Sequence, residues 1–136
     1  PAEWPLAIEA MTRVTRAMKA YFITHACYGA FEHIYPGMLD LAVDNFDLEM
    51  ANNDLQTLNV FRRSPFTKDI SFGVVDSHSH VIEDVEAAKQ RIAEAMAVLP
   101  KDRIWVDPDC GLKTRTVEEA IAKLRVCVEA ACAFRN

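Results

Sequence analysis

The chain has 136 residues, of which 51% are hydrophobic and 26% are charged, with 15 Lys and Arg against 20 Asp and Glu. This acidic balance without a basic cluster argues against a nucleic-acid partner, because affinity for phosphates comes from concentrated Lys and Arg. No apolar run reaches the roughly 18 to 20 residues that a membrane-spanning helix needs, and no charged-then-apolar leader opens the sequence. We therefore expect a soluble, folded, cytoplasmic chain of about one domain's length.

The first half of the chain alternates helical and strand patterns. Apolar side chains at positions 7, 11, 14 and 18 predict one stripe of an amphipathic helix, and residues 21–24 predict a short buried strand. Pro36 is favoured in a first helical turn and predicts a helix to Val43. Residues 46–50 predict the next strand, and turn-forming residues 52–54 precede a predicted helix over residues 55–61.

The second half repeats this alternation. Residues 70–76 predict a third strand with a β-branched core, and apolar positions 85, 88, 92, 95 and 99 predict the crossover helix that follows. Residues 103–107 predict a fourth strand, which Pro108 ends. Residues 116–119 (Thr-Val-Glu-Glu) have the signature of a capping box, and the last helix is predicted to pack through apolar positions 117, 121, 124, 128 and 131.

Helices alternating with short apolar strands predict an α/β fold of parallel βαβ units with right-handed crossovers. No linker or repeat divides the sequence, so we expect residues 1–136 to form a single domain. A TIM (β/α)8 barrel needs roughly 200 to 250 residues, and this chain, which begins with a helix, has about half of one. We expect a partial barrel of four strands, which belongs to a longer protein or is completed by another chain.

Side chains that can bind a metal follow each predicted strand at its carboxyl end, where barrels and open α/β folds place active sites. They are His25 and Cys27 after the first strand, Glu49 at the end of the second, His78 and His80 after the third, and Cys110 after the fourth. Residues i and i+2 of an extended segment point the same way, so His25 and Cys27 can bind one ion together. Two thiolates, one imidazole and one carboxylate suit tetrahedral zinc. Core packing remains the alternative for a single cysteine after a strand.

The remaining cysteines and histidine have simpler interpretations. Four cysteines in a non-secreted chain are too few and too widely spaced for a disulfide scaffold. Cys127 and Cys132 lie five residues apart near the apolar stripe of the last helix, which favours packing. His33 is expected to be an exposed loop residue.

Residues 76–80 (Asp-Ser-His-Ser-His) resemble the D-x-H-x-H metal motif of the amidohydrolases, which are also barrels. In that family the motif lies on the first strand, and further metal-binding histidines follow far downstream. Only 56 residues follow His80 in this chain, and none of them is a histidine, which argues against this family.

A second resemblance spans nearly the whole chain. The segments that carry it are THACY at 24–28, LE at 48–49, GVVDSHS at 73–79 and, above all, WVDPDCGLKTR at 105–115. They resemble the C-terminal catalytic barrel of cobalamin-independent methionine synthase, and the eleven-residue run is the most specific of them. The match covers the last four strands of that barrel, without its first half or the extra N-terminal domain of the long enzymes.

The resemblance implies a zinc site made by His25, Cys27, Glu49 and Cys110, which are four of the six residues found at the strand ends. It implies that His78 is the proton donor, whereas from its chemistry alone His78 could instead be hydrogen-bonded to a ligand carboxylate. The family usually has H-S-P here, and His80 replaces that proline, which changes the local backbone.

Four charged side chains flank the fourth strand end. Asp107 and Asp109 are candidates for orienting the ligands or the amino group of the substrate, and they equally suit a role in shaping the turn. Lys113 and Arg115 could meet a carboxylate, but solvated loop charges are the favoured interpretation.

Three functions follow from these interpretations. The leading one is zinc-dependent methyl transfer to homocysteine, which gives methionine, from a methyl-tetrahydrofolate or methyl-corrinoid donor. The second is transfer of another alkyl group to another thiol, such as coenzyme M. The third is a non-catalytic, zinc-binding half-barrel that acts as a homo-oligomer or with a complementary chain.

Overall fold

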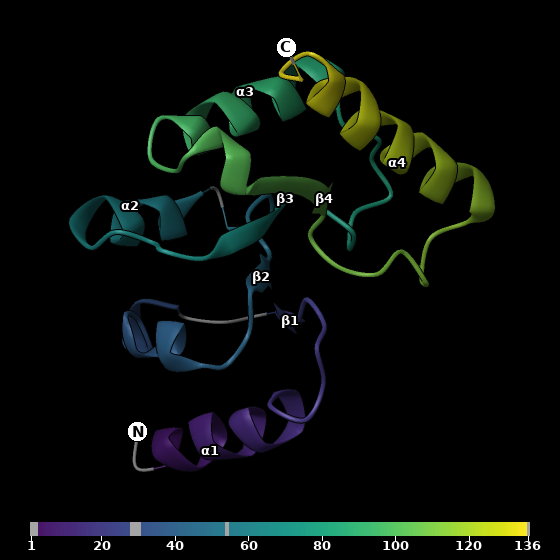
Figure 1. Cartoon of the computed structure of the whole chain (residues 1–136). Coiled ribbons are helices and arrows are strands. Elements are labelled where there is room, and N and C mark those ends of the chain that lie inside the picture. The colour runs from purple at the N-terminus through teal and green to yellow at the C-terminus, as the bar shows by residue number, and fades with distance from the viewer. Residues whose placement is uncertain (1–2, 28–30, 54, 136) are drawn as a thin grey trace.

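The computed structural model of the chain describes residues 3–27, 31–53 and 55–135. Its α-helices are α1 (Trp4–Thr15), α2 (Gln56–Arg63), α3 (Val85–Met96) and α4 (Val117–Cys132). Its strands are β1 (Ile23–Ala26), β2 (Asn45–Leu48), β3 (Asp69–Val75) and β4 (Ile104–Pro108). Three short 3-10 turns, η1 (Phe31–His33), η2 (Gly37–Asp40) and η3 (Lys101–Arg103), complete the regular structure of these residues, as Figure 1 shows.

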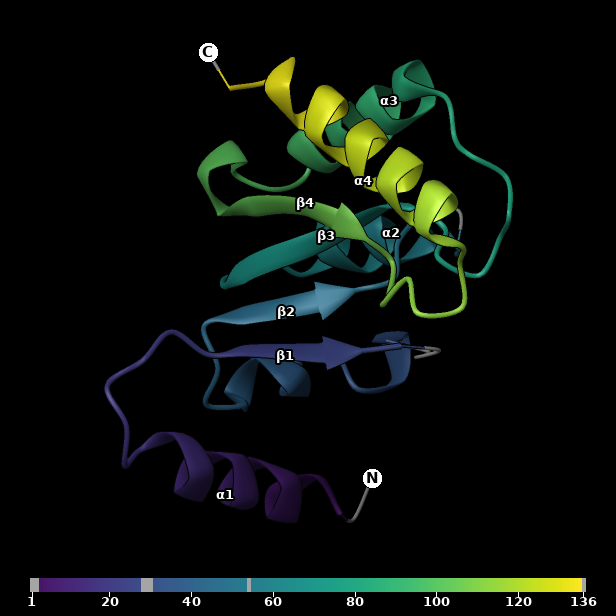
Figure 2. The ribbon, with the colours of Figure 1, turned by 90° about the vertical axis from the view of Figure 1, so that its right-hand side faces the viewer.

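The four strands form one parallel sheet in the order β1-β2-β3-β4, and Figure 2 shows them side by side with their arrowheads pointing the same way. Consecutive strands are neighbours throughout, as in the wall of a (β/α)8 barrel, whereas a doubly wound sheet reverses its strand order. The α/β prediction and the half-barrel prediction are both confirmed.

The two faces of the sheet differ in chemistry. Large apolar side chains of neighbouring strands share one face through the pairs Phe46↔Ile70 and Leu48↔Phe72, and all four are at most 2% exposed. These residues join one core with the buried side chains of α3 and α4. The opposite face carries the paired row His25, Asp47, Ser71 and Trp105, which is mostly polar. The polar face therefore leads directly to the strand ends where metal ligands are expected.

Several predicted elements differ from the structure. The helix expected over 36–43 is only the 3-10 turn η2, because Leu41 already has an extended backbone and β2 begins at Asn45. The first strand is Ile23–Ala26, two residues later than predicted. The capping box at the start of α4 is confirmed, with reciprocal bonds between Thr116 and Glu119.

The predicted packing face of α4 is wrong. Val117, Ile121, Leu124 and Val128 are 70%, 53%, 47% and 59% exposed. The buried residues of the helix are Lys123, Val126, Cys127 and Ala130, because α4 packs against α3 and β4 through its other side. None of the helices in the described ranges has the length and apolar character to cross a membrane.

Candidate metal centre

The candidate ligands come from three different strands and meet because the strands are parallel. His25 lies in β1 and Cys27 follows that strand, Glu49 directly follows β2, and Cys110 comes two residues after β4. The carboxyl ends of parallel strands lie at one edge of a sheet, which is the edge at the arrowheads in Figure 2. Residues far apart in the sequence are thereby brought together.

A nitrogen of His25 and the sulfurs of Cys27 and Cys110 lie within 4.8 Å of one another. One ion can therefore contact all three donors with small side-chain adjustments, and a zinc–sulfur bond is about 2.3 Å long. Desolvation raises the pKa of the Cys27 thiol, and the nearby Cys110 and Glu49 raise it further. The like charges that these groups would carry favour a cation between them.

Glu49 is not part of that three-residue group, although it directly follows β2 at the same edge of the sheet. Its side chain is buried, with 4% of the residue exposed, and its Oε1 is 3.3 Å from Nε2 of His78. The charge of Glu49 contributes to the raised pKa of the Cys27 thiol. His78 thus contacts the carboxylate, the arrangement considered above as the alternative to proton donation.

Asp47 holds the ring of His25. Its Oδ2 is 2.8 Å from Nδ1 of His25, which leaves Nε2 as the nitrogen that can bind a metal. Asp47 was not among the predicted site residues, although alternation along an extended segment places its side chain on the same side as that of Glu49, two residues later. Burial, followed by the charge of Asp47, raises the pKa of Asp107 to about 7.

Asp109 is completely buried, and its carboxylate accepts three backbone hydrogen bonds. Met50 and Ala51 donate to Oδ1 at 2.9 Å each, and Asn52 donates to Oδ2 at 2.6 Å. Asp107 is partly exposed, with one buried oxygen that has no hydrogen-bond partner among the described residues. The two aspartates beside the candidate ligand Cys110 therefore have different surroundings.

The loop that carries His78 is tied to α4 by a buried ion pair. Lys123 has a fully buried side chain, and its Nζ donates to Oε2 of Glu83 at 2.8 Å and to the carbonyl of Val81. The other oxygen of Glu83 accepts a bond from the amide of Asp76, whose own carboxylate accepts from the amide of His78. The sequence offers no clear signal for this pair, because α4 contains four other charged residues and nothing in their pattern marks Lys123 as the buried one.

The remaining candidates are not members of the three-residue group. His80 pairs with Glu119 through a 2.9 Å contact, and His33 is exposed. Cys127 is buried as predicted, whereas Cys132 is exposed and does not pack in the core. Lys113 is exposed, but Arg115 is partly buried, and two of its nitrogens lack a hydrogen-bond partner among the described residues, so it is not a solvated charge.

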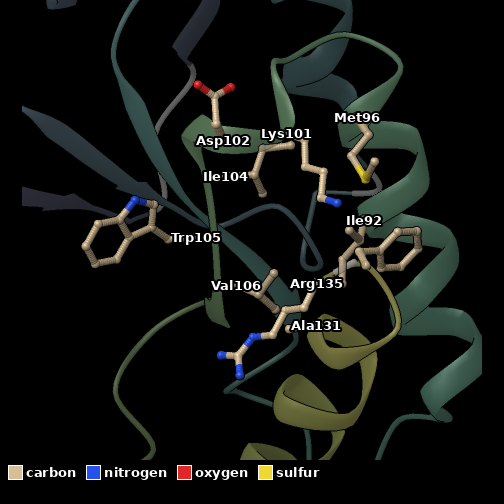
Figure 3. Close-up of a pocket in the computed structure, with 10 residues that line it drawn as sticks. Ile92, Met96, Lys101, Asp102, Ile104, Trp105, Val106, Ala131 and Arg135 are labelled. Atoms are coloured by element: carbon tan, nitrogen blue, oxygen red, sulfur yellow. The ribbon is translucent and has the colours of Figure 1, made fainter.

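A cavity of about 690 Å³ lies elsewhere, where η3 and the beginning of β4 meet the last turns of α3 and α4. Figure 3 shows Met96, Lys101, Val106 and Arg135 around it, while Trp105 points to the opposite side of the strand. The cavity contains none of the candidate ligands, so we do not connect it with the metal chemistry.

Comparison with known proteins assigns the chain to a family. The chain is 39% identical over 127 residues to the 5-methyltetrahydropteroyltriglutamate–homocysteine methyltransferase of Bacillus subtilis (strain 168), covering 92% of the chain and 17% of that enzyme. It is 40% identical over 106 residues to the enzyme of the same name from Pasteurella multocida (strain Pm70), covering 78% of the chain and 14% of that enzyme. The chain thus spans less than a fifth of these relatives.

Solved structures show the same fold. A B12-independent methionine synthase from Shewanella sp. W3-18-1, in complex with selenomethionine, superposes with a TM-score of 0.82 at 20% identity, covering 94% of this chain and 42% of that one. A putative vitamin-B12 independent methionine synthase from Listeria monocytogenes superposes with a TM-score of 0.65 at 24% identity, covering 94% and 40%. The family model described as "Cobalamin-independent synthase, Catalytic domain" matches residues 1–133. The chain belongs to the family of cobalamin-independent synthase catalytic domains.

Proposed function

We propose that this domain takes part in zinc-dependent methyl transfer to the thiol of homocysteine, which gives methionine. The observation that carries the proposal is the convergence of His25, Cys27 and Cys110, whose donor atoms lie within 4.8 Å of one another. Both curated relatives described above are named as methyltransferases that act on homocysteine. The proposal extends that activity to a chain that spans only a small part of each relative.

The donors present suit zinc. Two sulfurs and one imidazole nitrogen are ligands that zinc prefers in proteins. Glu49, at the same edge of the sheet, is our candidate for the fourth ligand, which it could supply after a change of its side-chain conformation. Asp47 fixes the tautomer of His25, as is usual for histidines that bind zinc. Two thiolates and one carboxylate carry one more negative charge than zinc carries positive, so such a site is rich in electrons.

When bound, zinc would lower the pKa of a substrate thiol and supply a sulfur nucleophile at neutral pH. A free alkyl thiol has a pKa near 8.5, so only a few per cent of it is ionised at that pH. Because the ligands themselves need reduced cysteines, we place this chemistry in the cytoplasm.

The proposed role of His78 is to give a proton to the methyl donor. The nitrogen of methyl-tetrahydrofolate leaves poorly unless it is protonated, so a general acid is needed for that donor. The side chain of His78 is 39% exposed and its Nε2 is 3.3 Å from Oε1 of Glu49. A methyl-corrinoid donor would not need this proton.

A second candidate function is a zinc-binding half-barrel that is inactive alone. It is favoured by the sheet of only four strands among the described residues, and by the small share of each relative that the chain spans. In this case zinc binding would be present, and turnover would require a complementary half-barrel.

The decisive experiment measures zinc content and thiol activation together. We expect about one zinc per purified chain, and we expect homocysteine to release a proton on binding to the zinc-loaded chain, whereas methionine, whose sulfur carries no proton, does not. His25→Ala should lose the zinc, and His33→Ala, which removes an exposed histidine away from the cluster, should keep it. Equal zinc content in the two variants would refute the site. Zinc with proton release but without methionine formation would favour the half-barrel.

A further inference from the structure

The carboxylate of Asp109 connects the ends of two strands that are not neighbours. Asp109 directly follows β4, and its three hydrogen-bond donors, the amides of Met50, Ala51 and Asn52, follow β2. In the sheet order β1-β2-β3-β4, strand β3 lies between them. The side chain of Asp109 therefore spans the middle strand to reach the loop after β2.

We call the carboxylate of Asp109 and its three backbone hydrogen bonds the bridge. Gly73 of β3 leaves room for it. A Cβ atom at position 73 would lie 2.0 Å from Oδ1 of Asp109 and 2.8 Å from its Cα. Both distances are far shorter than any van der Waals contact, so no other residue fits at position 73 while the carboxylate keeps its place. Gly73 and Asp109 act together as one structural unit.

Each end of the bridge is one residue away from a candidate ligand. Glu49 directly precedes Met50, and Cys110 directly follows Asp109. The carboxylate is 0% exposed, and both its oxygens are engaged by backbone amides, so it is satisfied without any substrate. We propose that Asp109 is a positioning residue of the metal centre, which holds the loop that begins at Glu49 next to the strand end that carries Cys110. This inference rests on the proposed function.

The test uses Asp109→Asn in the full chain, with zinc affinity measured by competition with a chelator. Asn keeps the shape of the side chain but has only one oxygen, and its NH₂ group would face a backbone N–H. We expect zinc affinity to fall about 10- to 100-fold, as for other residues that orient metal ligands. In a Glu49→Gln background the same change should cost less than about threefold, because the ligand that Asp109 positions is already altered.

A matched control separates positioning from a general loss of stability. Leu99→Ala truncates a buried core residue after the carboxyl-terminal end of α3, at the opposite end of the sheet, and should leave zinc affinity within about twofold of the wild type. Equal loss of affinity in Leu99→Ala and Asp109→Asn would overturn the proposal. So would a loss that is the same with and without Glu49→Gln.

A measurement on the wild-type chain covers the case in which Asp109→Asn does not fold. Coupling between two sites is reciprocal, so if the bridge favours zinc, zinc must stabilise the bridge. Hydrogen exchange at the amides of Met50, Ala51 and Asn52 should slow when zinc is added, and unchanged exchange would overturn the proposal. A wild-type chain that binds no zinc would refute the proposed function and this inference with it. Zinc binding that Asp109→Asn leaves intact would refute this inference alone.

Discussion

At the scale of single residues, His78 has two roles to distinguish. Its Nε2 is 3.3 Å from Glu49, which suits a residue that orients a ligand, and its side chain is 39% exposed, which suits a residue that meets the methyl donor. The two roles predict different measurements. Orientation acts on zinc affinity, whereas proton donation acts on the rate only when the leaving group needs a proton.

We expect His78→Gln to slow methyl transfer from methyl-tetrahydrofolate by about 10²- to 10⁴-fold, the usual contribution of a general acid. In that reaction the thiol sulfur bonds to the methyl carbon, the carbon–nitrogen bond breaks, and the nitrogen takes the proton of His78. Transfer from methylcobalamin, whose leaving group needs no proton, should change less than about threefold. Rates with both donors are to be compared in assays reconstituted with the rest of the barrel, with His33→Gln as control. A fall in zinc affinity with equal slowing for both donors would assign His78 to orientation.

The sequence predicted the site best where the arrangement of residues depends only on their neighbours in the same strand. Alternation along a strand places His25 and Cys27 on the same side, and the structure brings their donor atoms together with that of Cys110. It was silent on Asp47 as the partner of His25 and on the three backbone donors of Asp109. Those contacts depend on the register between strands and on loop paths, which a single sequence does not encode as a pattern.

At the scale of elements, the link between α4 and the β3–α3 loop depends on a buried charge pair. Lys123 is 0% exposed and pairs with Glu83, whose second oxygen accepts from Asp76. Removing one partner of a buried pair leaves the other charge without compensation, which costs more than removing both. The pair therefore attaches the loop that carries His78 to α4.

We expect Lys123→Met to lower the free energy of unfolding by about 3 kcal/mol and the double variant Lys123→Met/Glu83→Gln to recover much of the loss. Urea unfolding of both variants gives the comparison. Lys89→Met is the matched control, because it breaks the exposed pair with Glu86 within α3 and should cost less than about 1 kcal/mol. Similar losses of unfolding free energy for Lys123→Met and Lys89→Met would show that the buried pair contributes no more to stability than the exposed pair.

Helix α4 also shows why its packing face could not be predicted. Val117, Ile121, Leu124 and Val128 form a regular apolar stripe, but so do Val126, Cys127 and Ala130 on another side. Periodicity identifies an amphipathic helix with one apolar face and cannot choose between two. The choice is made by α3 and β4, which pack against the second group.

At the scale of the whole molecule, the four-stranded sheet ends in β1 and β4, each paired on one side among the described residues. Large apolar side chains of these edge strands are exposed, Ile23 of β1 at 51% and Trp105 of β4 at 48%, and so is Val14 of α1 at 62%. Together with the exposed stripe of α4 and the cavity beside β4, they leave much apolar surface in contact with water. Apolar surface of this extent marks interaction sites in soluble proteins.

We therefore expect the isolated chain to associate at micromolar concentrations, with a native mass above the 15.3 kDa of one copy. Ile121→Gln/Val128→Gln should reduce this association, because both residues belong to the exposed stripe of α4. Arg125→Gln/Glu129→Gln, on exposed positions of the same helix, also ends in two glutamines without changing the net charge and should leave association unchanged. Sedimentation across a concentration series measures all three proteins. A wild-type chain that stays monomeric at all concentrations would show that this apolar surface does not drive association. Equal effects of the two double variants would show that the apolar stripe of α4 is not the contact surface.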